Sequence, residues 1–201
     1  DDAKGLLLSS IADPNPVIFL EHRWLHNVHS KFKKGNYKIK IGKAKICKKG
    51  SDITIISMSY LTLEALAAAE FLFKKFKIKA EVIDLRTIKP LDWKTIFRSV
   101  EKTKRLLVLD TGFTTGSVAG EIIAKISINK FKKLKAAPAR LAMPDVPEPT
   151  SFALTKNFHV SAKDIIKKVL VILNIKSKKK LQYLSLTKYH DQPGDWFKGP
   201  F

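Results

Sequence analysis

From residue 50 onward, short and almost entirely apolar runs alternate with longer amphipathic segments. The runs suited to strands cover residues 53–56, 80–83, 106–109 and 139–142. Runs without polar alternation are typical of strands that are buried on both faces of a parallel sheet. The pattern therefore predicts a sheet that is covered on both sides.

The segments between these runs carry apolar residues at helical spacing, in stripes that begin at Leu61, Trp93, Val118 and Ile165. Ser161 and Asp164 have the spacing of a capping box just before the last stripe. Each crossover is long enough to hold a helix. We therefore predict an α/β fold with an open, mainly parallel sheet and helices on both faces.

Residues 1–29 have a different pattern. A short helix should end near Ala12, because Pro14 and Pro16 disfavour helical backbone in the residues before them. A turn and a buried strand over 17–20 should follow. The chain begins with Asp and with a helix already under way, so we expect it to be the C-terminal portion of a longer protein, with any targeting signal out of view.

We divide the chain into four parts. After 1–29, a basic linker over 30–48 is rich in lysine, and its alternation at 38–41 predicts a strand or two at a sheet edge. The α/β domain follows over 49–175. A tail over 176–201, with scattered Pro and Gly, is expected to lie over a surface or against a partner.

Composition narrows the class of protein. Of the 201 residues 45% are hydrophobic, which excludes a disordered chain, and no apolar run approaches the ~20 residues that a membrane span needs. The single cysteine excludes an internal disulfide and favours a reducing, cytoplasmic setting. The net charge of +20 comes from 33 Lys and only five Arg, whereas nucleic-acid readers favour Arg, so nucleic acid is an unlikely partner.

Three histidines, His22, His26 and His29, have a spacing that raises the question of a metal site. Zinc needs ligands that converge on one tetrahedron, and this sequence has no H-E-x-x-H motif and no cysteine pair. Surface or interface histidines are therefore the favoured interpretation.

Residues 112–117 form a glycine-bearing turn between a strand and a helix, where free backbone N–H groups can hold a phosphate. The turn lacks the third glycine of the dinucleotide fingerprint and the Gly-Lys-Ser/Thr of a P-loop, so a plain tight turn is favoured. Asp84 and Asp110 end their strands, where catalytic carboxylates often lie, but helix capping explains them equally well.

Cys47 allows two interpretations. Neighbouring lysines would lower the pKa of its thiol and make an exposed side chain reactive. The favoured alternative is a small, buried apolar residue on a strand over 45–47.

Five stretches together carry a resemblance to a known family: 42–45, 50–55, 80–92, 105–122 and 144–150. With them the chain resembles the beta subunit of the decarboxylating component of 2-oxo acid dehydrogenase complexes, of the pyruvate or branched-chain type, in the transketolase superfamily. Residues 1–29 resemble the last helix and strand of the family's pyrimidine-binding domain. Residues 49–175 resemble its transketolase C-terminal domain.

The resemblance implies oxidative decarboxylation of a 2-oxo acid, with acyl transfer to lipoyl groups. In the family, thiamine diphosphate supplies the chemistry, and it is bound with Mg²⁺ by the upstream half and the alpha subunit. We therefore assign no catalytic or cofactor-binding residue here, and we expect the fragment to be inactive alone. Implied partners are the alpha subunit, a second beta subunit and a dihydrolipoyl acyltransferase, with this segment serving subunit assembly and acyltransferase docking.

One metal site is implied by the same resemblance. Several members of the family bind a structural K⁺ ion at the matching positions, which here are Ser10, Ile11, Asp13 and Asn15. A turn that ends a helix offers free carbonyls to such an ion. The alternative is that Asp13 and Asn15 are ordinary turn formers.

Docking poses an electrostatic problem, because the acyltransferase's binding domain is usually basic and a partner at +20 would repel it. A local cluster of acids would solve it, and the candidates are Asp110, Glu121, Asp145 and Glu148. The tail offers aromatic anchors at Trp196, Phe197 and Phe201.

Two further functions are compatible with these residues. One is another transketolase-superfamily enzyme, of the transketolase or deoxyxylulose-phosphate synthase type. The second is a basic binding module without chemistry, whose affinity for a polyanion would fall steeply with salt.

Overall fold

A computed structural model describes residues 2–29, 34–156 and 158–176, together with Asp191, Gln192, Gly194, Trp196, Phe197 and Gly199 of the tail. In this part of the chain, no helix is both long and apolar enough to cross a membrane. The helices are α1 (Asp2–Ile11), α2 (Leu61–Phe76), α3 (Trp93–Thr103), α4 (Val118–Lys130) and α5 (Ala162–Ile172). The strands are β1 (Lys45–Lys48), β2 (Ile53–Ser57), β3 (Ala80–Asp84), β4 (Leu106–Phe113) and β5 (Ala139–Met143), and short 3₁₀ turns occur at Arg23–Leu25 and Phe131–Lys133.

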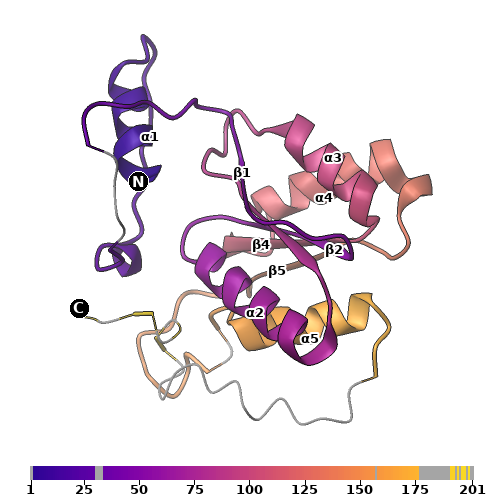
Figure 1. The fold of residues 1–201 in the computed structure, drawn as a ribbon. Coiled ribbons are helices and arrows are strands. Elements are labelled where there is room, and N and C mark those ends of the chain that lie inside the picture. Colours follow the sequence, from indigo (N-terminus) through magenta and orange to yellow (C-terminus); the bar gives the residue numbers. More distant parts are fainter. Residues whose placement is uncertain are drawn as a thin grey trace.

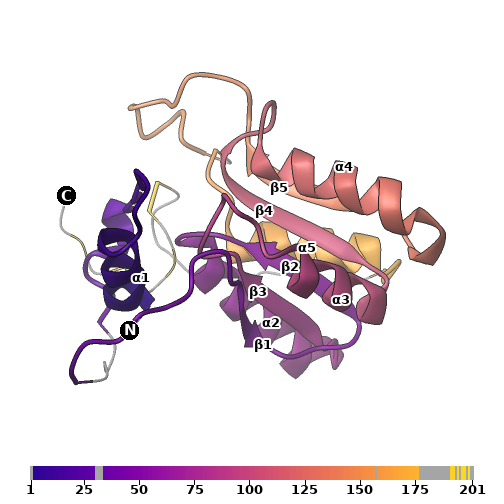
Figure 2. The ribbon, with the colours of Figure 1, turned by 90° about the horizontal axis from the view of Figure 1, so that it is seen from above.

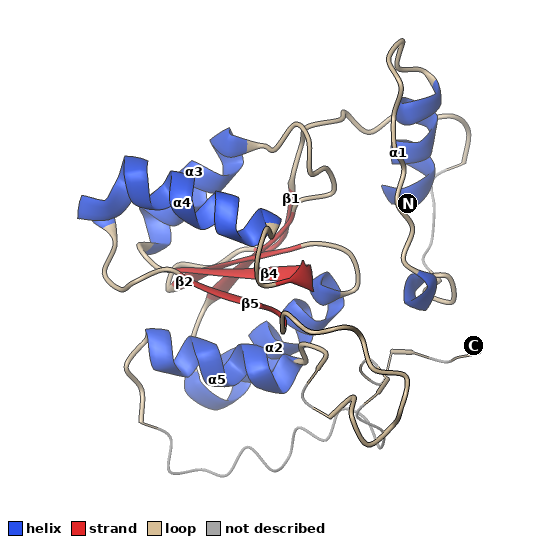
Figure 3. Cartoon of the chain, turned by 180° about the vertical axis from the view of Figure 1, so that it is seen from behind, coloured by secondary structure: helices blue, strands red, loops and turns tan. Residues whose placement is uncertain are grey.

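The strands form one sheet in the order β1-β3-β2-β4-β5. Neighbouring strands from β3 to β5 run parallel, and β1 pairs antiparallel with β3 at one edge. Helices α2 and α5 cover one face of the sheet, and α3 and α4 cover the other (Figures 1 and 3). The predicted open, mainly parallel α/β sheet is confirmed.

The central strands are buried as their sequences predict. Every residue of β2 is buried, as are the first residues of β3 and β4, since a hydrophobic cluster packs on each face. For 139–142 the prediction of burial on both faces is wrong, because β5 is an edge strand that is only partly covered. The capping box at the start of α5 is confirmed, since the Asp164 carboxylate accepts from both the N–H and the hydroxyl of Ser161.

The structure of residues 2–29, before the domain, agrees only in part with the prediction. Helix α1 ends at Ile11, as the prolines predict. The predicted buried strand over 17–20 is wrong: this stretch has no strand structure, and Ile18 and Leu20 are each 86% exposed. Strand structure requires a neighbouring strand for the backbone groups, and none of the described strands pairs with it.

In its described residues, 34–48, the linker contributes one strand. Strand β1 lies at the sheet edge, as predicted for this lysine-rich stretch. The alternation at 38–41 produces no strand, and Ile39 bonds helix α1: the Ile39 N–H donates to the Gly5 carbonyl at 3.1 Å, and the Ser9 hydroxyl donates to the Ile39 carbonyl at 2.6 Å. A side chain on Gly5 would collide with Ile39 at 2.6 Å, so glycine permits this approach.

Two of the stretches that carry the family resemblance dock on each other. Arg86 donates from Nε and Nη2 to the Lys43 carbonyl at 3.1 and 2.9 Å, and the Gly42 N–H donates to the Thr87 hydroxyl at 3.1 Å. Asp92 accepts from the Ala44 N–H at 3.2 Å. These bonds form a joint between residues 42–44 and 86–92 that brings β1 to the edge of the sheet.

A buried carboxylate lies within the sheet. Glu81 on β3 is 1% exposed and accepts from the Ser99 hydroxyl at 2.5 Å, from the Gly50 N–H at 3.3 Å and from the Lys102 ammonium. Ser99 in turn bonds Thr54, 2.7 Å away. Burial acts to raise the pKa of Glu81, but the hydrogen bonds from Lys102, Ser99 and Gly50 together outweigh it and hold the pKa below the usual 4.5.

We expect Glu81→Gln to lower the free energy of unfolding by about 1–3 kcal/mol, because it leaves buried donors without a charged acceptor. The depressed pKa means that this difference from wild type is fully present above pH 4.5 and disappears as the pH falls through the lower pKa of the folded protein. Urea unfolding at several pH values would measure it. Glu70→Gln is the control, because Glu70 is exposed and solvent screens its ion pair with Lys74. Equal losses in both variants would contradict the assignment.

Candidate functional site

The four residues of the expected cation site lie in one turn after α1. The Asp13 N–H donates to the Ser10 carbonyl at 3.3 Å, and Asp13 Oδ1 accepts from the backbone N–H and the side-chain amide of Asn15, both at 3.0 Å. These bonds lower the pKa of Asp13, so its carboxylate is ionised at neutral pH. The negative end of a helix dipole and a carboxylate therefore meet at this turn, which suits a cation.

The histidines of 22–29 do not form a metal site. Among the residues that the structure describes, no group of three or more His, Cys, Asp or Glu side chains can hold a metal ion. His22 instead caps the short 3₁₀ turn, with Nδ1 accepting from the Trp24 N–H at 3.3 Å.

The two aspartates at strand ends organise turns. Asp84 Oδ1 accepts from the Arg86 N–H at 3.1 Å, and burial raises the pKa of Asp84. Asp110, 5% exposed, accepts from the Gly112 N–H and from the Ala119 N–H in the first turn of α4, both at 2.9 Å. Asp84 therefore shapes the turn that follows β3, and Asp110 caps the first turn of α4.

The turn at 112–117 is closed by contacts within the chain. Thr115 donates from its N–H and its hydroxyl to the two oxygens of Asp145, each at 2.8 Å, and the Thr114 N–H donates to the Met143 carbonyl at 2.9 Å. Asp110 and the Ser117 hydroxyl already accept the first N–H groups of α4. A phosphate would meet a carboxylate here, so the plain-turn interpretation stands.

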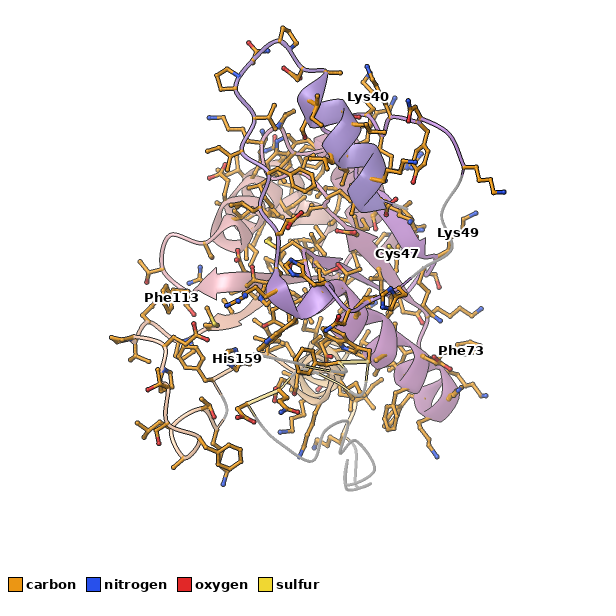
Figure 4. All side chains as sticks on the ribbon, turned by 90° about the vertical axis from the view of Figure 1, so that its left-hand side faces the viewer. Lys40, Cys47, Lys49, Phe73, Phe113 and His159 are labelled. Atoms are coloured by element: carbon orange, nitrogen blue, oxygen red, sulfur yellow. The ribbon has the colours of Figure 1, made fainter. Side chains whose placement is uncertain are left out.

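Cys47 is a half-buried residue of β1, as favoured, and it packs against the core cluster beneath α2 and α5 (Figure 4). Burial raises the pKa of its thiol, with the Asp84 charge acting in the same direction. The charge of the neighbouring Lys45 acts to lower this pKa, as expected, but burial and the Asp84 charge outweigh it, so the net shift is upward.

The candidate acids of the docking cluster have separate roles. Asp110 is buried as a helix cap, so it is not available on the surface. Asp145 is bonded to Thr115, and Glu148 lies 3.6 Å from His159. Of the aromatic anchors, Trp196 packs against the chain's own core and Phe201 lies outside the described residues.

A cluster of rings that the sequence did not reveal joins three distant parts of the chain. Trp24 contacts Tyr60, with ring centroids 4.8 Å apart, and His159, 5.2 Å apart. His22 lies 4.7 Å from Tyr60, and Phe197 of the tail lies 6.2 Å from Trp24. We call this set the aromatic cluster; it lies where β2 leads into α2, at the carboxyl end of the sheet.

One buried acid beside the cluster also escaped prediction. Glu64 on α2 is 2% exposed and lies on the face that carries Leu61, Ala65 and Ala68. A charged residue three positions after Leu61 and four before Ala68, in an otherwise apolar stripe, was the one local signal that could have revealed it.

Burial controls the charge of the cluster's histidines. For His22, burial and the charges of His159 and His26 lower the pKa, against the opposing effect of Glu148. For His159, burial lowers the pKa and outweighs the raising effects of Glu148 and Asp191. Burial also raises the pKa of Tyr60. The cluster is therefore built for uncharged rings at neutral pH.

Comparison with known proteins gives matches over most of the chain. The family model "Transketolase, C-terminal domain" matches residues 42–165. The pyruvate dehydrogenase E1 component subunit beta of Chaetomium thermophilum is 44% identical over 74% of this chain and 40% of its own length. The corresponding subunit of Bacillus subtilis is 41% identical over 76% of this chain and 47% of its own length.

Two further proteins match this chain. The beta subunit of acetoin:2,6-dichlorophenolindophenol oxidoreductase of Cupriavidus necator is 38% identical over 82% of this chain and 48% of its own length. A solved structure described as a split gene transketolase, inactive beta4 tetramer, aligns with a TM-score of 0.60 at 23% identity, over 70% of this chain and 45% of that one. It supports the fold alone.

We expect acid to loosen the aromatic cluster. The unfolded chain binds protons at the histidines as the pH falls through 6.5, while the folded chain binds them only at the lower pKa values, so stability is lost below about pH 6.5. Thermal unfolding between pH 5 and 8 would show the slope. His159→Gln should flatten it, whereas His29→Gln, at an exposed position, should not. An unchanged slope in His159→Gln would contradict the prediction.

Proposed function

Because this chain belongs to the transketolase C-terminal domain family, we propose that it is the C-terminal part of the beta subunit of a thiamine-diphosphate-dependent 2-oxo acid dehydrogenase. In this proposal the whole enzyme decarboxylates pyruvate or a branched-chain 2-oxo acid and passes the acyl group to lipoyl groups. The observation that carries the proposal is the identity of 41–44% to pyruvate dehydrogenase beta subunits.

The chain spans about two fifths to half of the length of the curated relatives it matches. The proposal therefore assigns decarboxylation to sequence outside these 201 residues. The Ala119 and Gly120 N–H groups at the start of α4 already donate to Asp110 and to the Ser117 hydroxyl, so we propose no diphosphate contact there. We assign no step of the reaction to this chain.

The role proposed for the chain is assembly with an alpha subunit and a second beta subunit, and docking of the acyltransferase. The loop between β5 and α5 supports an interaction role, because Val146, Phe152 and Leu154 are 50–69% exposed there. Large apolar side chains exposed within one loop are candidates for such contacts.

Assays would separate the substrates and reaction types that are compatible with this family. The similarity to the acetoin oxidoreductase subunit makes acetoin a second substrate candidate. A transketolase-type enzyme would instead transfer carbon units between sugars. A basic binding module would bind polyanions with an affinity that falls steeply with salt.

A K⁺ ion is proposed at the turn after α1. Ser10 and Ile11 would offer carbonyls at the negative end of the helix dipole, and Asp13 would offer its carboxylate, with Asn15 completing the turn. The role of the ion would be to fix the direction in which the chain leaves α1.

The proposed function predicts activity only in the assembled enzyme. We expect no decarboxylation by the 201-residue chain alone, and thiamine-diphosphate-dependent decarboxylation when the chain is extended by its upstream sequence and combined with an alpha subunit. Pyruvate, branched-chain 2-oxo acids and acetoin would be compared by reduction of an artificial electron acceptor. An assembled complex that is inactive on all of them but active in sugar transfer would favour a transketolase.

The K⁺ site predicts an ion-specific gain in stability. A tenfold excess of K⁺ over its Kd would add about 1.4 kcal/mol to the free energy of unfolding. Melting temperatures in KCl and NaCl at equal ionic strength would measure the gain. Asp13→Asn should abolish the difference, and Glu121→Asn, at an exposed position on α4, should keep it. Equal melting temperatures of the wild-type chain in the two salts would reject the site.

A further inference from the structure

The described residues of the tail lie close in space to the N-terminal segment. In Figures 1 and 2 they lie on the side of the molecule where α1 and the 3₁₀ turn at Arg23–Leu25 are found, away from α3 and α4. All of them follow residue 165, where the match to the family model ends. They therefore lie outside the part of the chain that the family model matches.

The first contact of the tail is with the buried carboxylate of Glu64. Oε1 accepts from the Gly194 N–H at 3.1 Å and from the Trp196 Nε1–H at 2.7 Å, while Oε2 accepts from the Ala162 N–H at 2.8 Å. All three partners are N–H donors, so a carboxylate matches them and an amide would not. A charge that is 2% exposed requires such donors, because burial without them is costly.

Gly194 is fitted to this contact. A Cβ at this position would lie 2.7 Å from Glu64 Oε1 and 3.1 Å from the Trp196 ring. The carboxylate cannot move aside without losing the hydrogen bonds that hold it. Glycine therefore lets the tail backbone approach α2 closely enough to bond.

The second contact of the tail is with residues 22–27. Phe197 packs near Trp24, with ring centroids 6.2 Å apart, and the Asn27 side-chain amide donates to the Gly199 carbonyl. Trp196, 6.3 Å from Phe197, packs against the core cluster beneath α2 and α5. The tail thus contacts the domain with one ring and the preceding segment with the next.

We infer that the described tail residues Gly194, Trp196, Phe197 and Gly199 act as a strap, which binds residues 22–27 to the start of α2 and fixes how the segment before the domain meets it. The other end of that segment is fixed independently, because Asp2 pairs with Lys45 at 2.8 Å and with Arg86 at 3.5 Å. With the strap in place the segment is attached at two points. Without it, the segment keeps the contacts of Asp2, of the His22 and Trp24 rings with Tyr60, and of Leu25 with the core cluster.

Hydrogen exchange tests the strap in the whole chain. The N–H groups of Leu25, His26 and Val28 are bonded within the 22–28 turn, at 2.9–3.1 Å. Trp196→Phe keeps a ring but removes the donor to Glu64, and we expect the peptide over 22–28 to exchange about tenfold faster, with α3 and α4 unchanged. Trp93→Phe is the matched control, because Trp93 lies on the opposite face of the sheet and undergoes the same replacement of an indole by a phenyl ring.

A second pair of variants alters the same contact at its other two residues, Gly194 and Glu64. Gly194→Ala and Glu64→Gln should accelerate exchange in the same peptide, the first by the added methyl and the second by replacing one acceptor with a donor. Exchange over 22–28 that is unchanged in Trp196→Phe and Gly194→Ala would overturn the inference. Equal acceleration across all helices in Trp196→Phe would also overturn it, because it would show general destabilisation without a local strap.

Discussion

The joint between residues 42–44 and 86–92 determines where the chain enters the domain. Arg86 and Thr87 hold the backbone of 42–43, and Asp92 holds Ala44 while it caps α3 through the Thr95 N–H at 3.2 Å. The same few bonds therefore place β1 beside β3 and start the helix that follows β3. Without them the edge strand and the first turn of α3 would lose their anchors together. The recognisable motifs of 42–45 and 80–92 thus serve the architecture of the fold.

Local patterns predicted the elements whose environment is set by their own sequence. The buried strands β2, β3 and β4 and the helical stripes could be predicted because apolar periodicity reports burial directly. Pairing could not be read in this way. Residues 17–20 are as apolar as a buried strand, yet no described strand lies beside them, and residues 38–41 alternate like a strand but contact a helix. Apolar periodicity predicts which residues are buried, whereas the helix or strand that they pack against depends on the rest of the chain.

The candidate sites also differ in whether their contacts are local in the sequence. Turn formers such as Asp13 and Asp110 were predictable, because their bonds reach residues nearby in the chain. The aromatic cluster was not, because it brings Trp24, Tyr60 and His159 together from segments far apart in the sequence. The family model does not cover the whole cluster either, because it begins at residue 42, after Trp24, and ends at residue 165, before the tail. Glu64 alone left a local trace, as an acid on an apolar helix face.

Placement of the acids also bears on which partner this domain can accept. Only 18 acidic residues face 38 basic ones, and Glu64, Glu81, Asp92 and Asp110 are buried as acceptors for the chain's own donors. The surface is therefore more basic than the composition alone indicates. A basic partner would be repelled at long range, and burial of Asp110 leaves Glu121, Asp145 and Glu148 as the exposed members of the candidate acidic cluster. Short-ranged apolar contacts would add to what these three acids offer such a partner. The exposed side chains of Val146, Phe152 and Leu154 provide contacts of that kind.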